Sequence, residues 1–132
     1  MKSITGFYAH TPGEGSEWHD LVLHLRETAT RARDNAAKFG AGEVGYLAGL
    51  WHDVGKFNPA FQEYLVLCES ADHNGDPPPA KSVPHAVYGS KLARESYPPL
   101  TQVIYGHHGG LPEIETRYGI PLMASIRRPK RT

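Results

Sequence analysis

The chain is organised around residues Leu47–Lys56, which read Leu-Ala-Gly-Leu-Trp-His-Asp-Val-Gly-Lys. The residues before the histidine are apolar almost all the way round, which is typical of a helix buried at the centre of a domain. In an α-helix, predicted here from about Glu43 to Val54 or a little beyond, Lys56 returns to the face that carries His52 and Asp53. Three polar side chains can therefore converge at the end of a core helix.

Asp53 needs a partner if it is buried. A buried carboxylate is costly to desolvate unless a cation or a metal pairs with it, and the imidazole of His52 offers a second ligand with a neutral nitrogen. The alternative is that His52 and Asp53 hydrogen-bond each other and cap the helix. The positions of the other histidines help to decide between a metal site and a helix cap.

Length and composition limit the number of domains, the partners and the location that we expect for the protein. The 132 residues predict one domain, and 14 basic and 14 acidic side chains cancel, so no global field attracts nucleic acid or a membrane surface. Cys68 is the only cysteine, which excludes an internal disulfide framework and a thiolate-rich zinc site. No run of about 18 apolar residues and no secretory signal appears. We therefore expect a cytoplasmic protein that is not held in a membrane.

A long amphipathic helix is predicted from a cap at Ser16 to about Phe39, before Gly40. Its apolar positions recur at steps of three and four residues: Trp18, Leu21, Val22, Leu25, Ala29, Ala32 and Ala36. His24 lies at the border of this stripe and can reach inward, whereas His19 is expected to be solvated.

The middle of the chain is less regular. Asn58 and Pro59 predict the start of a short third helix with an apolar side formed by Phe61, Tyr64 and Leu65. Residues 68–83 are polar and rich in helix breakers, so we expect a mobile loop there, with His73 on the surface. His10, in the lead before the first helix, is a loop histidine that could lie near the site.

Two later helices carry histidines on their packing faces. The first starts at Pro84 and places these residues on one face: His85, Tyr88, Gly89 and Leu92. In the second, the same spacing joins Leu100, Val103, Ile104 and His107. His108 follows directly, before the helix stop at Gly109 and Gly110.

The inward-facing histidines are therefore spread over four helices: His24, His52, His85, His107 and His108. Five imidazoles around one aspartate, without a metal, would leave unmet polar groups and repel one another when protonated. One or two divalent ions resolve both problems. A ligand set of imidazole and carboxylate suits Mn, Fe, Co, Ni or Zn better than Mg alone. Since no convincing strand alternation appears, the predicted fold class is all-α.

These motifs, in their order, resemble the HD phosphohydrolase superfamily and, more closely, the HD nuclease of the CRISPR type I interference machinery. The stretches that carry the resemblance are Tyr8-Ala9-His10, Gly49–Lys56, Phe61-Gln62 and His107–Gly110. The resemblance covers about residues 7–111 and implies an HD-domain helical bundle over residues 1–111. It also implies cleavage of single-stranded DNA, with a superfamily 2 helicase and the CRISPR surveillance complex as partners.

The resemblance further implies roles for single residues. The metal ligands would be His24 and His52 for one ion, His85, His107 and His108 for the other, and Asp53 as the bridge. Lys56 matches the lysine that supports the reacting phosphate, so Asp53 and Lys56 are the expected catalytic residues.

One departure from the family pattern concerns a late aspartate that completes the first metal's shell. No aspartate follows Asp76, and Glu113 and Glu115 are the only carboxylates after His108. We therefore expect a weak or empty first metal site, and a divergent or truncated segment over residues 112–132 with a basic tail. Dimerisation would compensate for missing helices. The alternatives are an HD-family nucleotide phosphohydrolase and a catalytically degenerate module that binds metal or regulates.

Overall fold

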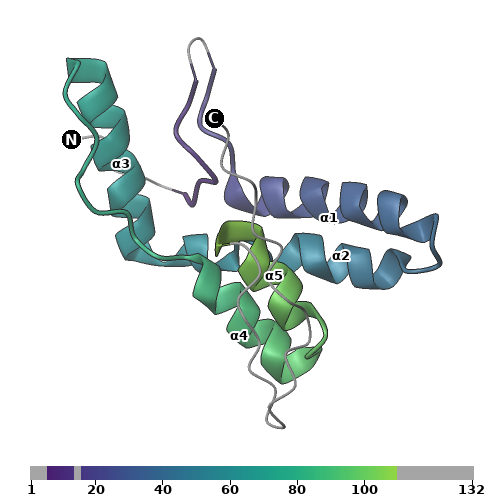
Figure 1. The fold of residues 1–132 in the computed structure, drawn as a ribbon. Coiled ribbons are helices and arrows are strands. Elements are labelled where there is room, and N and C mark those ends of the chain that lie inside the picture. Colours follow the sequence, from purple (N-terminus) through teal and green to yellow (C-terminus); the bar gives the residue numbers. More distant parts are fainter. Residues whose placement is uncertain (1–5, 14–15, 110–132) are drawn as a thin grey trace, which may run out of the picture.

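The computed structural model describes residues 6–13 and 16–109, and these are all-α, as the sequence predicts (Figure 1). The elements are α1 (Leu21–Ala37), α2 (Gly42–Trp51), the 3₁₀ helix η1 (Val54–Phe57), α3 (Pro59–Asn74), α4 (Ala86–Ser96) and α5 (Leu100–Gly109). Within the described ranges the only β-type pairing is one isolated bridge between Tyr8 and Asp20.

Helices α1 and α2 form an antiparallel pair (Figure 1). Two glycines of α2 permit the close approach: a Cβ atom on Gly49 would lie 2.6 Å from the Cα of Ala29, and one on Gly45 would lie 2.6 Å from the Cβ of Ala36. Because the helices run in opposite directions, the start of α1 meets the end of α2. His24 is thereby brought next to the residues that follow Trp51.

The start of α1 differs from the prediction, since Asp20 rather than Ser16 caps the helix. The Asp20 carboxylate accepts a hydrogen bond of 2.8 Å from the Leu23 N–H. The residues just before the helix instead pair with residues 7–9. The Ala9 N–H donates to the His19 carbonyl at 2.9 Å. Trp18 therefore packs on the Tyr8 ring, 5.1 Å away between centroids, and is not part of the helix. Long-range backbone pairing has overridden the local helical pattern.

The predicted cap of α3 is confirmed, because the Asn58 side chain accepts a hydrogen bond of 3.0 Å from the Ala60 N–H and Pro59 follows it. The predicted loop over residues 68–83 is wrong for its first part, since α3 continues to Asn74. Polar residues are tolerated there because α3 buries only a short face and extends away from the other helices (Figure 1). The helix ends at Gly75, which adopts a left-handed conformation with φ of 72°. His73 is exposed, as predicted.

Helix α2 lies between two apolar clusters, which explains why its sequence is apolar on most sides. On one side Leu50 packs against a cluster formed by Ala9, Leu21 and Leu25. On the other, the cluster consists of Ala93, Leu100 and Ile104, and α2 contributes Val44, Leu47, Ala48 and Trp51. Burying an aliphatic side chain such as Ile104 stabilises the fold by about 1.5–3 kcal/mol.

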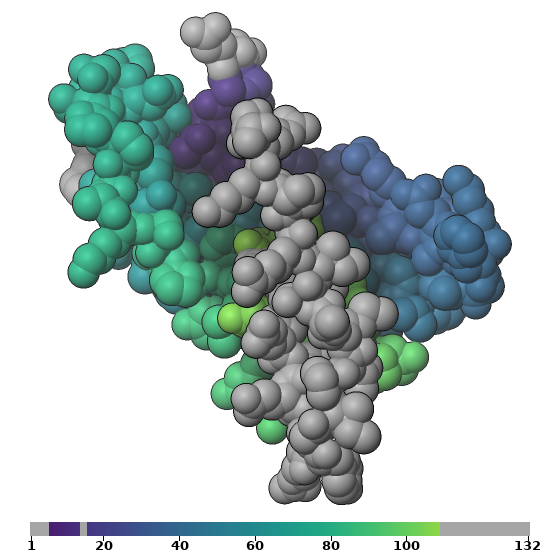
Figure 2. All heavy atoms as spheres, viewed as in Figure 1, coloured from purple at the N-terminus to yellow at the C-terminus, as the bar shows by residue number. Residues whose placement is uncertain are grey.

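Helices α4 and α5 pack against each other and against the end of α2. Figure 2 shows them between α3 on one side and the α1–α2 pair on the other. The predicted start of α4 is displaced by two residues: the helix begins at Ala86, and His85 precedes it as the N-cap residue. Tyr88 and Val103, predicted on packing faces, are 50% and 55% exposed. The predicted segment over residues 112–132 lies outside the described residues.

No described helix combines the length and the apolar character that crossing a membrane requires.

Candidate metal centre

Asp53 lies where the α-helix stops. Helix α2 ends at Trp51, His52 still has helical dihedral angles, and Asp53 leaves them with φ of −120° and ψ of 18°. The predicted continuation of the α-helix to Val54 or a little beyond is therefore wrong, and the turn of η1 replaces it, with the Lys56 N–H donating to the Asp53 carbonyl at 3.0 Å. The predicted convergence of the three side chains is nevertheless confirmed.

One oxygen of the Asp53 carboxylate, Oδ2, faces three nitrogen atoms from two helices and the η1 turn. Lys56 Nζ lies 2.9 Å away, His52 Nε2 3.2 Å and His24 Nε2 3.5 Å. The Asp53 side chain is only 6% exposed, so these groups form the immediate surroundings of a buried charge. His24 reaches this point because α1 packs antiparallel to α2.

The other oxygen, Oδ1, faces His85, the residue before α4, and His108 of α5. His108 Nε2 lies 3.0 Å from Oδ1 and His85 Nε2 lies 3.8 Å from it. The carboxylate thus belongs to two groups of possible metal ligands, each with its atoms within 4.8 Å of one another: His24, His52 and Asp53, and Asp53, His85 and His108.

His107 is the one predicted ligand that belongs to neither group among the described residues. Its ring packs edge-on against the rings of His52 and His108, with centroid distances of 5.3 and 4.9 Å. It contacts the other histidines of the centre but is not in either group of ligand atoms around the carboxylate. Its assignment as a ligand stays a prediction.

Two buried polar atoms show that a cation fits this centre. Among the described residues, Asp53 Oδ1 and His24 Nε2 have no hydrogen-bond partner. His108 Nε2 is close to Oδ1 but is not aligned for a hydrogen bond with it; it pairs with the His52 carbonyl at 3.3 Å. Buried polar groups without partners are rare in folded proteins, and a metal ion would satisfy both atoms.

The outward nitrogens of two histidines are held by backbone carbonyls. His52 Nδ1 donates to the Gly49 carbonyl, and His85 Nδ1 donates to the Val83 carbonyl at 3.4 Å. In neutral imidazoles this leaves the lone pair of Nε2 directed at the carboxylate, which is the usual arrangement of metal-bound histidines. A set of imidazole nitrogens and carboxylate oxygens without thiolate suits first-row divalent ions.

The pKa shifts of His24 and His85 agree with ligation, whereas that of His52 favours a protonated ring paired with Asp53 when no metal is bound. Burial lowers the pKa of His24 and His85 below the ordinary value, which favours the neutral form that binds a metal. Burial alone would raise the pKa of Asp53, but hydrogen bonds and charges from His52 and Lys56 outweigh it and hold this pKa far below its usual range. Burial opposes protonation of His52 too, yet Asp53 raises the pKa of this histidine.

Gln62 is a residue of the site whose role the sequence did not reveal. Its buried amide accepts from the Tyr8 N–H at 2.9 Å and donates to the carbonyls of Tyr8 and Lys56 at 2.9 and 2.8 Å. Lys56 Nζ in turn donates to the Ala9 carbonyl at 2.9 Å. The resemblance named Phe61-Gln62 among its motifs, but the role of Gln62 became clear only from the position of residues 8 and 9 in the structure.

Gly55 brings His85 to the centre. A Cβ atom at Gly55 would lie 1.8 Å from the His85 carbonyl oxygen, so only glycine lets the η1 turn touch the backbone before α4.

His19 is partly solvated, as predicted, but it also packs beside the site. Its side chain is 28% exposed, and its ring lies 5.4 Å from the His24 ring between centroids. His10 lies beside it, with ring centroids 5.3 Å apart, so both histidines flank the centre. The pairing of residues 7–9 with residues 19–21 produces this arrangement, and helical periodicity could not indicate it.

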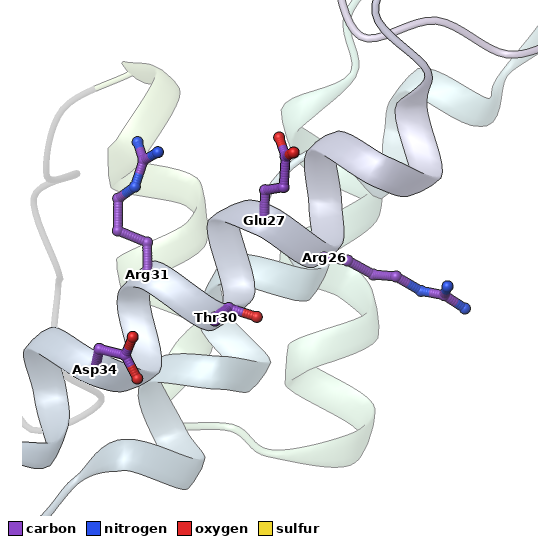
Figure 3. A pocket seen from close by; sticks show the side chains of 5 residues that line it. All are labelled: Arg26, Glu27, Thr30, Arg31 and Asp34. Atoms are coloured by element: carbon purple, nitrogen blue, oxygen red, sulfur yellow. The ribbon is translucent and has the colours of Figure 1, made fainter.

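A hollow also lies elsewhere, on the outward face of α1 (Figure 3). It is lined by Arg26, Glu27, Thr30, Arg31 and Asp34. Opposite charges alternate there, and the side chains project into solvent. This depression has no buried polar group comparable to Asp53, so we assign the chemistry to the centre between the helices.

Comparison with known proteins agrees with this geometry. The family model described as "Cas3, HD domain" matches residues 40–125, about two thirds of the chain. The matched region contains the five residues His52, Asp53, Lys56, His85 and His108, whereas His24 lies before it and is joined to them by the fold. The match also extends beyond residue 111, and the boundary predicted there stays a prediction. None of the curated proteins compared with the chain matches it.

Proposed function

The chain belongs to the family of Cas3 HD domains, and from this premise we propose that it is a metal-dependent nuclease that cleaves single-stranded DNA during CRISPR interference. Family membership supports the coarser statement, a metal-dependent HD nuclease or phosphohydrolase. The single-stranded DNA substrate and the CRISPR role are the finer parts of the proposal, and they rest on the resemblance of the motifs.

The observation that carries the proposal is the position of Asp53 between two groups of nitrogen ligands. His24 and His52 would hold one divalent ion with Oδ2, and His85 and His108 would hold a second with Oδ1. Such ions, when bound, activate water and neutralise the charge that develops on a phosphodiester.

Lys56 would bind the substrate phosphate. Its ammonium group is held at 2.9 Å from both Asp53 Oδ2 and the Ala9 carbonyl, so it lies at the centre in a defined position. A lysine ammonium is a compact cation with three N–H donors, which suits it to donate hydrogen bonds to phosphate oxygens. Because its backbone carbonyl is bound by Gln62, the lysine is oriented from both ends.

A second candidate function is a catalytically impaired module that binds metal and regulates a partner. Within the described residues, Asp53 is the only carboxylate in either ligand group, so each ion would have few anionic ligands. This candidate requires metal binding without turnover under any divalent ion.

The test is to incubate the full chain, loaded in turn with Mn²⁺, Ni²⁺, Co²⁺, Zn²⁺ or Mg²⁺, with single-stranded DNA and with mononucleotides. We expect cleavage of the DNA that Asp53→Ala abolishes and that Asp34→Ala, on the outward face of α1, preserves. Hydrolysis of mononucleotides with intact DNA would replace the nuclease by a nucleotide phosphohydrolase. Metal binding without either reaction would favour the regulatory module.

The partners belong to the same proposal. We expect a superfamily 2 helicase and a CRISPR surveillance complex to deliver the strand in the cytoplasm, and the chain to associate as a homodimer. Light scattering of the purified chain measures the last of these directly, and a monomer at micromolar concentration would remove the dimer from the proposal.

A further inference from the structure

His10 and His19 form a close pair at the edge of the Asp53 centre. His19 Nδ1 lies 3.3 Å from His10 Nε2, and neither residue belongs to the ligand groups around Asp53. The two residues come from different segments, the lead before α1 and the extended residues just before its cap. They meet because the Ala9 N–H binds the His19 carbonyl.

The second nitrogen of each ring faces an acceptor. His10 Nδ1 donates to the Thr11 carbonyl at 2.9 Å, since a carbonyl can only accept. His19 Nε2 lies 3.4 Å from the Glu27 carboxylate, which also only accepts when ionised. In a neutral imidazole only one nitrogen carries a proton, and when each ring carries it on the outer nitrogen the two inner nitrogens are free to bind a cation. Their two lone pairs then point at each other across 3.3 Å, an arrangement that a cation between them would stabilise.

The separation of the two nitrogens fits a shared metal ion. At 3.3 Å they are also within reach of a long N–H···N hydrogen bond, which would require one ring to carry its proton on the inner nitrogen and leave its outer nitrogen without a proton facing the Thr11 carbonyl or the Glu27 carboxylate. Two imidazole nitrogens bound to one ion at about 2.0–2.1 Å in tetrahedral geometry lie about 3.3–3.4 Å apart. A carbonyl or carboxylate behind each ring is also the usual partner of metal-bound histidines.

We propose that His10 Nε2 and His19 Nδ1 together bind one divalent transition metal ion, of the class of Zn²⁺, Ni²⁺ or Co²⁺, at a site separate from the Asp53 centre. The pair reaches solvent, since His10 is exposed, so an ion can enter and keep open positions for water or an anion. The His19 ring contacts that of His24, which places this ion beside the main centre. An anionic strand bound there would meet an additional positive charge.

The number of ions per chain tests this inference without any measurement of activity, so it stands or falls independently of the nuclease proposal. The full chain is dialysed against Zn²⁺, and bound zinc is counted in the wild type, His10→Gln, His19→Gln and His73→Gln. His73 is an exposed histidine on α3 and serves as the matched control. We expect His10→Gln and His19→Gln each to bind one ion fewer than the wild type, and His73→Gln to bind the same number.

Glu27→Gln should retain the ion with an affinity about 10-fold lower, because the carboxylate behind His19 is replaced by a neutral acceptor. Unchanged zinc counts in folded His10→Gln and His19→Gln would overturn the site. Should a variant fail to fold, ¹⁵N resonances of the imidazoles in the wild type decide: Zn²⁺ must shift His10 Nε2 and His19 Nδ1. If these resonances respond to acid alone and not to Zn²⁺, the pair shares a proton and the inference is wrong.

Discussion

Lys56 Nζ lies 2.9 Å from Asp53 Oδ2, the same carboxylate oxygen that His24 and His52 face. The lysine cation and a metal ion would therefore meet at one oxygen. This contact supports a division of roles in which the histidines and Asp53 hold the ion and Lys56 acts on the phosphate.

Replacing Lys56 by methionine tests that division. Lys56→Met keeps the apolar stem and removes the charge, so the bound metal should not decrease, because a competing cation has left Asp53. Turnover should fall by roughly 10²–10³-fold if the lysine stabilises the reacting phosphate. Elemental analysis and single-turnover cleavage measure the two effects. A loss of metal in the folded variant would show that Lys56 is structural.

Gln62→Glu should destabilise the protein by about 3 kcal/mol. The substitution keeps the shape but removes the N–H donors that bind the carbonyls of Tyr8 and Lys56, and a buried acceptor left unpaired costs about 1–3 kcal/mol. Urea denaturation measures the change. Glu63→Gln, the reverse exchange at the exposed neighbour, should stay within about 0.5 kcal/mol of the wild type. Equal effects at the two positions would contradict the role of Gln62.

Gly55→Ala should displace His85 from the centre. The new Cβ atom would lie 1.8 Å from the His85 carbonyl, so backbone must move, at a cost of about 3 kcal/mol. We expect loss of the metal bound on the Oδ1 side of Asp53. Gly42→Ala is the matched control, since its Cβ atom would meet nothing closer than 3.4 Å. Wild-type stability and metal content in Gly55→Ala would refute the close approach.

Metal content should depend on pH in a defined direction. Burial lowers the pKa of His24 and His85 below the ordinary 6.5, so protons displace the metal from these ligands only at a lower pH than from free imidazole. In the metal-free protein the unfolded chain protonates these histidines first, so their contribution to stability decreases as pH falls below about 6.5. Dialysis at stepped pH measures retention. Unchanged metal content at about pH 4.5, some two units below the ordinary histidine pKa, would contradict a histidine-dominated centre.

Adding a divalent ion should raise the midpoint of thermal unfolding. An ion at 100 times its dissociation constant stabilises the folded state by about 2.7 kcal/mol per site, because the unfolded chain lacks the assembled ligands. Asp53→Ala should lose most of this gain, whereas Asp72→Ala, at the exposed end of α3, should keep it. Scanning calorimetry with and without Mn²⁺ provides the comparison. An equal gain in both variants would place the ion elsewhere.

Several parts of the fold followed from local pattern. The cap at Asn58 is confirmed because an asparagine followed by proline satisfies the first turn of a helix by itself. The burial of Leu100 and Ile104 followed from their helical spacing. The length of α3 could not be predicted from the local pattern. A polar segment can remain helical when it needs to bury only one short face.

The sequence by itself determined the chemistry of the centre. Imidazole and carboxylate are present and thiolate is nearly absent, and the helical period of 3.6 residues assigned His24, His52, Asp53 and His108 to the ends or edges of helices that must pack. Only the tertiary structure decided how they meet. Asp53 leaves the helix, Gly55 admits His85, Gln62 secures Lys56, and backbone pairing of residues 7–9 with residues 19–21 joins His10 to His19. In the last three of these features at least one partner is a backbone group, which every amino acid has, so the helical spacing of the side chains carries no record of them.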